Sequence, residues 1–184
     1  EHVQQFDSTA KHVLAFLESK RHPVSGYIGQ AEGDRPGWAM RGYRNMVLGL
    51  YWPMGISEPD LPRLIDSTLS CQRDDGLFDD GGMCSNMDAI HLLAEYGLRC
   101  DHRLDQSIEA SRRCVAAMFE KLSHASGGFY FQLPGSSEAT RQGVRAMNAT
   151  AFTLETLRYW QAIDEQARDD LEATMRKLDI NLIT

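Results

Sequence analysis

The chain has 184 residues, of which 42% are hydrophobic and 24% are charged, a balance typical of one globular domain with a real core. Its formal net charge of −7 argues against a nucleic-acid partner, which requires a basic surface, and against docking to an anionic membrane. No stretch is apolar enough to span a bilayer and no secretory segment opens the chain, so we predict a soluble domain. Since the sequence opens on Glu1 rather than on Met, we expect either a processed form or an excised piece of something longer.

The four cysteines contain no Cys-x-x-Cys pair. A chain of this length with a good core does not need disulfides, so we predict reduced thiols and a cytoplasmic location. The positions concerned are Cys71, Cys84, Cys100 and Cys114.

Apolar residues recur at helical spacing along most of the chain, and this spacing predicts an all-α fold. Pro23 and Pro53 end the first two helices, because proline disfavours a helical residue before it. Pro59 suits the first turn of the third helix, and Gly97 suits the end of the fourth. The predicted helices cover about residues 3–20, 38–52, 58–69, 85–97, 103–123, 142–163 and 165–179.

Three loops share a glycine followed by aromatic or apolar residues, and they are spaced about 50 residues apart, a period typical of repeat architectures. Each loop joins an amphipathic helix to a more apolar one, which predicts three helix–loop–helix units; the alternative is a generic helical bundle. The loop sequences are Gly26-Tyr27-Ile28-Gly29, Gly76-Leu77-Phe78-Asp79 and Gly128-Phe129-Tyr130-Phe131.

One loop carries a family resemblance. The segment 71–78, Cys-Gln-Arg-Asp-Asp-Gly-Leu-Phe, resembles the Cys-Gln-x-x-Asp-Gly-Gly-Phe segment of α/α-toroid proteins, the terpenoid cyclases and protein prenyltransferase β subunits. Residues 88–93 resemble the start of an inner toroid helix, and 127–129 with 148–151 repeat the scheme more loosely. The resemblance covers about 55–160. It implies three repeated α-hairpins that form an open arc of an α/α toroid, plus a C-terminal helix.

The catalytic motifs of those families are not intact in this chain. The Asp-x-Asp-Asp motif of the cyclases is replaced by Arg-Asp-Asp-Gly at 73–76, and their repeated Gln-and-Trp motif is absent. The zinc ligands of the prenyltransferases are matched only loosely, by Asp80, Cys84 and His91. The resemblance therefore implies a domain that binds a small ligand or a partner. The alternative is an enzyme acting on an isoprenoid or a carbohydrate in a cleft lined by the Gly-rich loops.

The richest candidate site follows the second loop. Asp88 and His91 are three residues apart on a predicted helix, so they are neighbours and candidates for general acid–base catalysis. In the alternative interpretation, Asp88 balances the start of the helix and His91 is a buried histidine with a satisfied hydrogen bond.

Metal binding is a further interpretation of this segment. Asp80, Cys84 and His91 are allowed zinc ligands, and the acidic loop 74–80 offers oxygen atoms for calcium. Neither spacing matches an established signature, and a small buried cysteine and a solvated acidic turn are the alternatives. We predict no metal and no cofactor.

Arginines flank the other two loops, at 35, 41 and 44 and at 141 and 145. If the loops share one rim, an acidic centre lies between two basic clusters, where Arg41 and Arg145 can grip an anionic group; the alternative is surface ion pairing. The predicted ligand-binding residues are Asp79, Asp80, Cys84, Arg41 and Arg145. Three hairpins cannot close a toroid, so we also predict a homo-oligomer or packing on a missing segment.

Overall fold

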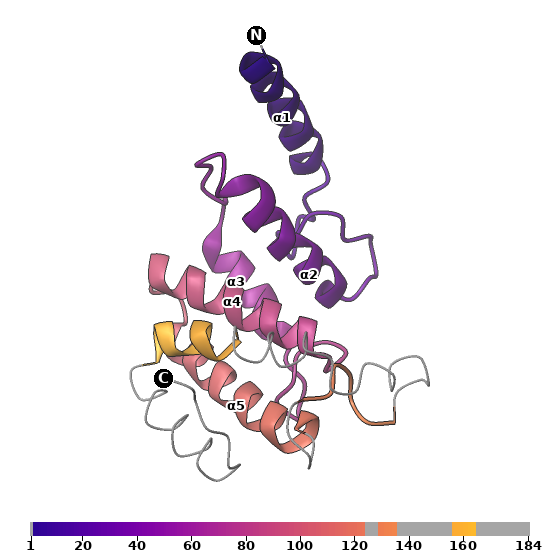
Figure 1. The fold of residues 1–184 in the computed structure, drawn as a ribbon, viewed down its shortest axis with the longest axis vertical. Coiled ribbons are helices and arrows are strands. Elements are labelled where there is room, and N and C mark those ends of the chain that lie inside the picture. The colour runs from indigo at the N-terminus through magenta and orange to yellow at the C-terminus, as the bar shows by residue number, and fades with distance from the viewer. Residues whose placement is uncertain (1, 124–128, 136–155, 165–184) are drawn as a thin grey trace.

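The computed structural model describes residues 2–123, 129–135 and 156–164, and within these ranges every regular element is helical (Figure 1). The prediction of an all-α fold is confirmed. The elements are α1 (His2–Glu18), α2 (Pro36–Met46), the π-helical turn η1 (Val47–Tyr51), α3 (Leu61–Ser70), α4 (Met83–Arg99), α5 (Leu104–Leu122) and a further helix over 156–163. None of the described helices is both long and apolar enough to cross a membrane.

Two predicted helix starts differ from the structure. α3 begins at Leu61 rather than near Pro59, because Asp60 occupies the N-cap and its side chain accepts a hydrogen bond from the Arg63 N–H. α4 begins at Met83 and continues past Gly97 to Arg99. The rest of the predicted helix 142–163 and the whole of 165–179 lie outside the described residues.

α4 is the centre of the described fold, because it packs against α2, α3 and α5. Its residues are buried around nearly the whole helix, as the fully buried Met83, Ile90, Leu93 and Tyr96 show. A helix that is apolar on most sides belongs in an interior. The helix over 156–163 is tied to α5, since Arg112 Nε donates to Asp164 Oδ2 at 2.6 Å.

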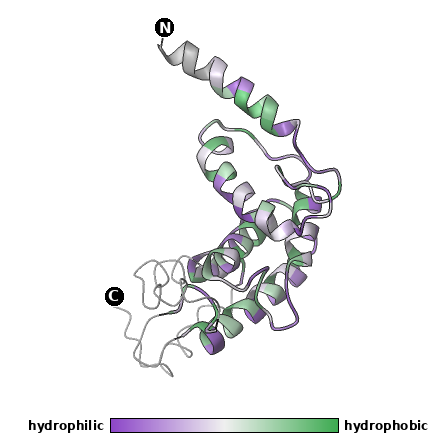
Figure 2. Ribbon diagram, turned by 90° about the vertical axis from the view of Figure 1, so that its right-hand side faces the viewer, coloured by the Kyte–Doolittle hydropathy of each residue, from purple (hydrophilic) through white to green (hydrophobic). Residues whose placement is uncertain are grey.

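α1 extends away from the rest of the fold in both views (Figures 1 and 2). Its C-terminal end is anchored, because Arg21 pairs with Glu18 at 2.7 Å and donates to the Tyr51 hydroxyl at 2.9 Å. Farther from this anchor, Phe16 is 62% exposed and Val13 is 46% exposed. The described fold therefore leaves apolar surface of α1 uncovered.

The three Gly-rich loops share a backbone geometry. Each follows a helix (α1, α3 or α5) and closes through one isolated antiparallel bridge: Arg21–Ile28, Gln72–Phe78 and Ser123–Phe129. A backbone hydrogen bond also recurs beside each bridge, from the N–H groups of Gly29, Asp79 and Tyr130 to the carbonyls of Lys20, Cys71 and Leu122 at 3.2, 2.9 and 2.6 Å. These positions recur about every 50 residues.

Candidate functional site

One face of α4 carries a row of polar residues at three- and four-residue spacing, which places them side by side along the helix. We call this row the α4 stripe, and it comprises Cys84, Asp88, His91, Glu95 and Arg99. α2 and the turn after it supply the residues that face it. The stripe has a loop end near Met83, a middle, and a C-terminal end at Arg99.

At the loop end, Arg41 joins the two aspartates that follow the second loop. Its Nη2 lies 3.6 Å from Asp79 Oδ2 and its Nη1 lies 3.3 Å from Asp80 Oδ2. The guanidinium also lies over the Trp38 ring, 4.0 Å from the centroid, and Trp38 is 74% exposed. Three of the predicted ligand-binding residues therefore meet. Because two carboxylates already neutralise Arg41, it is not a free clamp for an anion.

Asp79 complements the N-terminus of α2 from the neighbouring loop. It has a φ of 49° and occupies the place that Gly29 takes in the first loop. Its carboxylate lies against Gly37, where an added Cβ would be 2.1 Å from Asp79 Cγ. α2 has no acidic residue in its first turn and no side-chain cap, so Asp79 supplies the negative charge that a helix N-terminus favours.

Asp80 and Cys84 mark the start of α4. Asp80 Oδ1 accepts hydrogen bonds from the Gly82 N–H at 2.9 Å and from the Ser85 hydroxyl at 2.8 Å, which explains why the helix begins before Ser85. Burial raises the pKa of the half-buried Cys84, and the charge of Asp88 raises it further. The thiol therefore stays protonated, which disfavours a nucleophilic role.

The middle of the stripe is a buried polar cluster. Arg44 Nε donates to His91 Nδ1 at 2.9 Å and lies 3.5 Å from Asp88 Oδ1, and these three residues are only 8%, 2% and 3% exposed. Because arginine can only donate, Nδ1 of His91 must accept, so the neutral ring carries its proton on Nε2. Arg44, which the sequence suggested as part of a basic rim, lies in the interior instead.

Two aromatic rings enclose His91. The Tyr159 ring stacks on it with centroids 3.9 Å apart and planes inclined by 7°, and Trp52 meets it edge-on at 5.5 Å. The Tyr159 hydroxyl also accepts from Arg44 Nη2 at 3.4 Å. The structure thus joins Asp88 and His91 as the sequence predicted, but it encloses them in packing, which favours the structural interpretation over acid–base catalysis.

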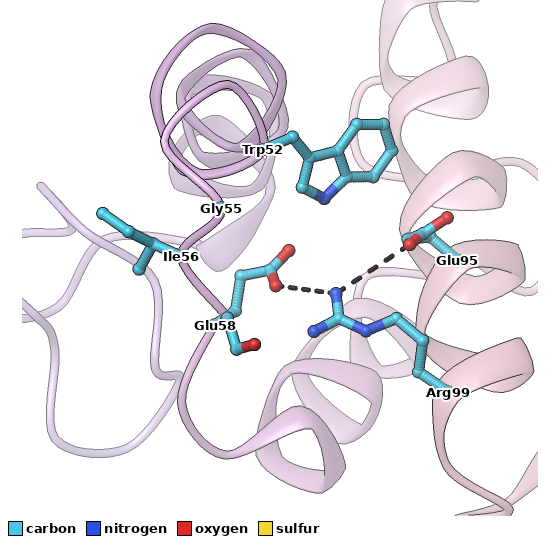
Figure 3. A pocket seen from close by; sticks show the side chains of 7 residues that line it. Trp52, Gly55, Ile56, Glu58, Glu95 and Arg99 are labelled. Carbon is cyan, nitrogen blue, oxygen red and sulfur yellow. Dashed lines mark hydrogen bonds and ion pairs between the residues drawn. The ribbon is translucent and has the colours of Figure 1, made fainter.

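At the C-terminal end, the stripe opens into a cavity of about 370 Å³ that sequence reasoning missed (Figure 3). The turn after η1 brings Glu58 to face α4, and Glu58 Oε2 accepts from Arg99 Nη1 at 2.6 Å. Glu95 lies 3.9 Å from the same nitrogen. The cavity is lined by Trp52, Gly55, Ile56, Ser57, Glu58, Glu95 and Arg99.

Burial and neighbouring charges shift the pKa values of Glu95 and Arg99 at this end of the stripe. It raises the pKa of Glu95 above its ordinary value, with Arg99 opposing the rise and Glu58 adding to it. Burial alone would lower the pKa of Arg99, but the hydrogen bond and charge of Glu58 raise it, so the guanidinium stays charged.

Comparison of the chain with protein-family models, with curated proteins and with solved structures found no match. The toroid resemblance therefore depends on the residues that carry it, and the candidate site depends on its own geometry.

Arg145, the second predicted anion-binding arginine, lies outside the described residues, together with Arg141. In the described part of the chain, no group of three or more His, Cys, Asp or Glu side chains could hold a metal ion. Each open end of the α4 stripe therefore has an aromatic ring, carboxylates and one arginine that is already paired. The ring is Trp38 at the loop end and Trp52 at the C-terminal end.

Proposed function

We propose that this chain is a toroid-like helical-repeat domain that binds a small polar molecule at the loop end of the α4 stripe without catalysing a reaction there. The observation that carries this proposal is the exposed ring of Trp38, held by Arg41 beside Asp79 and Asp80. An exposed aromatic face next to a few fixed polar groups is the usual composition of a small-molecule site.

The ligand class follows from these groups. The Trp38 ring offers a flat apolar surface, and the Asp80 side chain, 38% exposed, offers carboxylate oxygens that accept from hydroxyl groups. A saccharide presents both a C–H face and hydroxyl groups, so it matches this pair. An isolated anion matches less well, because Arg41 is already neutralised.

The recurring loop geometry supports the toroid-like arc. In addition, the second and third loops each contact the inner helix of the preceding unit: Asp79 lies against Gly37 of α2, and the Met83 N–H of α4 donates to the Phe131 carbonyl at 3.0 Å. Contact between each unit and its neighbour is what stabilises a repeat architecture.

A binding role is favoured over catalysis because His91 is the strongest acid–base candidate and its Nδ1 is already engaged by Arg44. The competing function is an enzyme acting on an isoprenoid or a carbohydrate. This enzyme function requires that the protein turn over a bound ligand. It also requires that Asp88→Asn lose this turnover while it binds the ligand with unchanged affinity.

The test is a titration with neutral and acidic saccharides, followed through the Trp38 indole N–H signal by NMR. We expect at least one saccharide to shift this signal and Trp38→Ala to lose binding. Leu98→Ala is the matched control, since Leu98 is an exposed apolar residue, 63% exposed, on α4 away from the loop end. Failure of every saccharide, or undiminished binding by Trp38→Ala, contradicts the proposal.

We also propose that the uncovered apolar face of α1 is buried in an assembly, either by a second copy of this chain or by a segment outside the described residues. Val13 and Phe16 supply the exposed surface for this contact. Sedimentation at micromolar concentration should show a dimer that Phe16→Ser weakens. If the unmodified chain and Phe16→Ser were both monomeric, a second copy of the chain would be excluded as the partner of α1.

A further inference from the structure

We infer that the cavity at the C-terminal end of α4 binds a primary ammonium group on a short apolar body, with Glu58 as the acceptor. This site lies at the opposite end of the α4 stripe from Trp38, and its chemistry differs from that proposed there. The inference therefore does not depend on the proposed saccharide site.

The first argument is an unused hydrogen-bond acceptor. The side chain of Glu58 is fully buried, with 0% exposure, and Oε2 is engaged by Arg99. Oε1 has no hydrogen-bond partner among the described residues, and in Figure 3 it points toward the Trp52 side of the cavity. A buried carboxylate oxygen without a donor is costly, so a donor supplied by a ligand would stabilise this position.

The second argument is the local charge. Two carboxylates, Glu58 and Glu95, face a single guanidinium, Arg99, which leaves one net negative charge at the cavity. The cavity also lies at the C-terminus of α4, where the last carbonyls of a helix carry partial negative charge. Both effects favour a cation over a neutral or anionic ligand.

The third argument is the shape and polarity of the lining. Trp52 and Ile56 provide the apolar wall, and the volume of about 370 Å³ lies at the small end of the range for small-molecule pockets. The Trp52 ring can contact both a cation and an aliphatic chain. A primary ammonium satisfies all three features, because it carries charge and donates N–H groups to Glu58 Oε1.

Isothermal titration calorimetry of the full chain tests this inference with three probes. n-Butylammonium has the charge, the N–H donors and the apolar body. Tetramethylammonium keeps the charge but has no donor, and n-butanol keeps the body but has no charge. We expect n-butylammonium to bind about tenfold more tightly than either of the others, since a hydrogen bond to a charged group has this worth.

Two carboxylate variants locate the site. Glu58→Gln keeps the shape but removes the charge, and we expect it to weaken n-butylammonium binding by about tenfold or more. Glu95→Gln should weaken it less, because Glu95 is only half-buried. Glu120→Gln, at an exposed glutamate of α5, is the matched control and should bind as the unmodified chain does.

Each outcome decides. Equal binding of tetramethylammonium would show that Trp52 rather than Glu58 recognises the cation, and equal binding of n-butanol would show that the cavity recognises only the apolar body; either overturns the inference. Unchanged affinity in a folded Glu58→Gln also overturns it. If circular dichroism shows that Glu58→Gln does not fold, the three probes and Glu95→Gln decide the matter.

Discussion

The middle and the C-terminal end of the α4 stripe are built from the same kinds of side chain but differ in the space that lies beside them. In the middle, Arg44 contacts both Asp88 and His91, and aromatic rings enclose the histidine. At the C-terminal end, Arg99 engages one oxygen of Glu58, and a cavity of about 370 Å³ lies beside this pair.

This difference shows that residue type alone does not separate a packing cluster from a binding site. A buried polar network enclosed by packing rigidifies a core, whereas one that lies beside free volume can accept a ligand. The comparison predicts that changes in the middle reduce stability, and that changes at the C-terminal end alter binding more than stability.

The largest effect is expected for Arg44→Ala. Removing the guanidinium takes away the cation that lies 3.5 Å from the buried Asp88 carboxylate, which should reduce the free energy of unfolding by about 4 kcal/mol. Urea denaturation followed by circular dichroism measures this loss. Arg35→Ala, at an exposed position before α2, is the control, and a loss below about 1 kcal/mol for Arg44→Ala would break the comparison.

His91→Ala should reduce the free energy of unfolding by about 3 kcal/mol, because it removes a ring packed between Tyr159 and Trp52 and the ring nitrogen that accepts from Arg44 Nε. The melting temperature should fall, while saccharide affinity at Trp38 should stay unchanged. Loss of ligand binding at unchanged stability would instead place His91 in a functional site.

Gly37→Ala tests the contact between neighbouring units. The added methyl group would lie 2.1 Å from Asp79 Cγ, so the second loop must shift, at a cost of about 2 kcal/mol in the free energy of unfolding. Gly42→Ala is the matched control in the same helix, since nothing lies within 4 Å of its Cβ, and it should stabilise by up to about 1 kcal/mol. Combining Gly37→Ala with Asp79→Gly should recover much of the loss.

The helices were largely predictable because helical periodicity and proline placement are local signals. The start of α4 was misplaced because Asp80, which precedes the helix by several residues, supplies the hydrogen bonds that allow it to begin at Met83. The start of α3 was predicted too early because Asp60 rather than Pro59 determines where the helix begins.

The site was predictable only in part, for a physical reason. The neighbourhood of Asp88 and His91 follows from helix geometry, and the meeting of Arg41 with Asp79 and Asp80 follows from the shared loop end. The cavity depends on a turn after η1 that buries Glu58, and no local pattern in the sequence predicts that this glutamate is buried.

The smallest effect, and the sharpest test of the comparison, is expected at Glu95. Its pKa is raised in the folded state by burial, so the folded protein binds this proton more tightly than the unfolded chain does. The contribution of Glu95 to stability is therefore greatest at acidic pH and falls as the pH rises above about 4, through the raised pKa. Glu95→Gln should remove this dependence and make the protein slightly more stable at neutral pH, as thermal unfolding between pH 4 and pH 8 would show.

The same variant, Glu95→Gln, should weaken n-butylammonium binding. A gain in stability together with a loss of affinity is therefore what we expect of a binding residue. If Glu95→Gln instead lowered stability at neutral pH, the carboxylate would be a structural partner of Arg99, and the C-terminal end would resemble the middle.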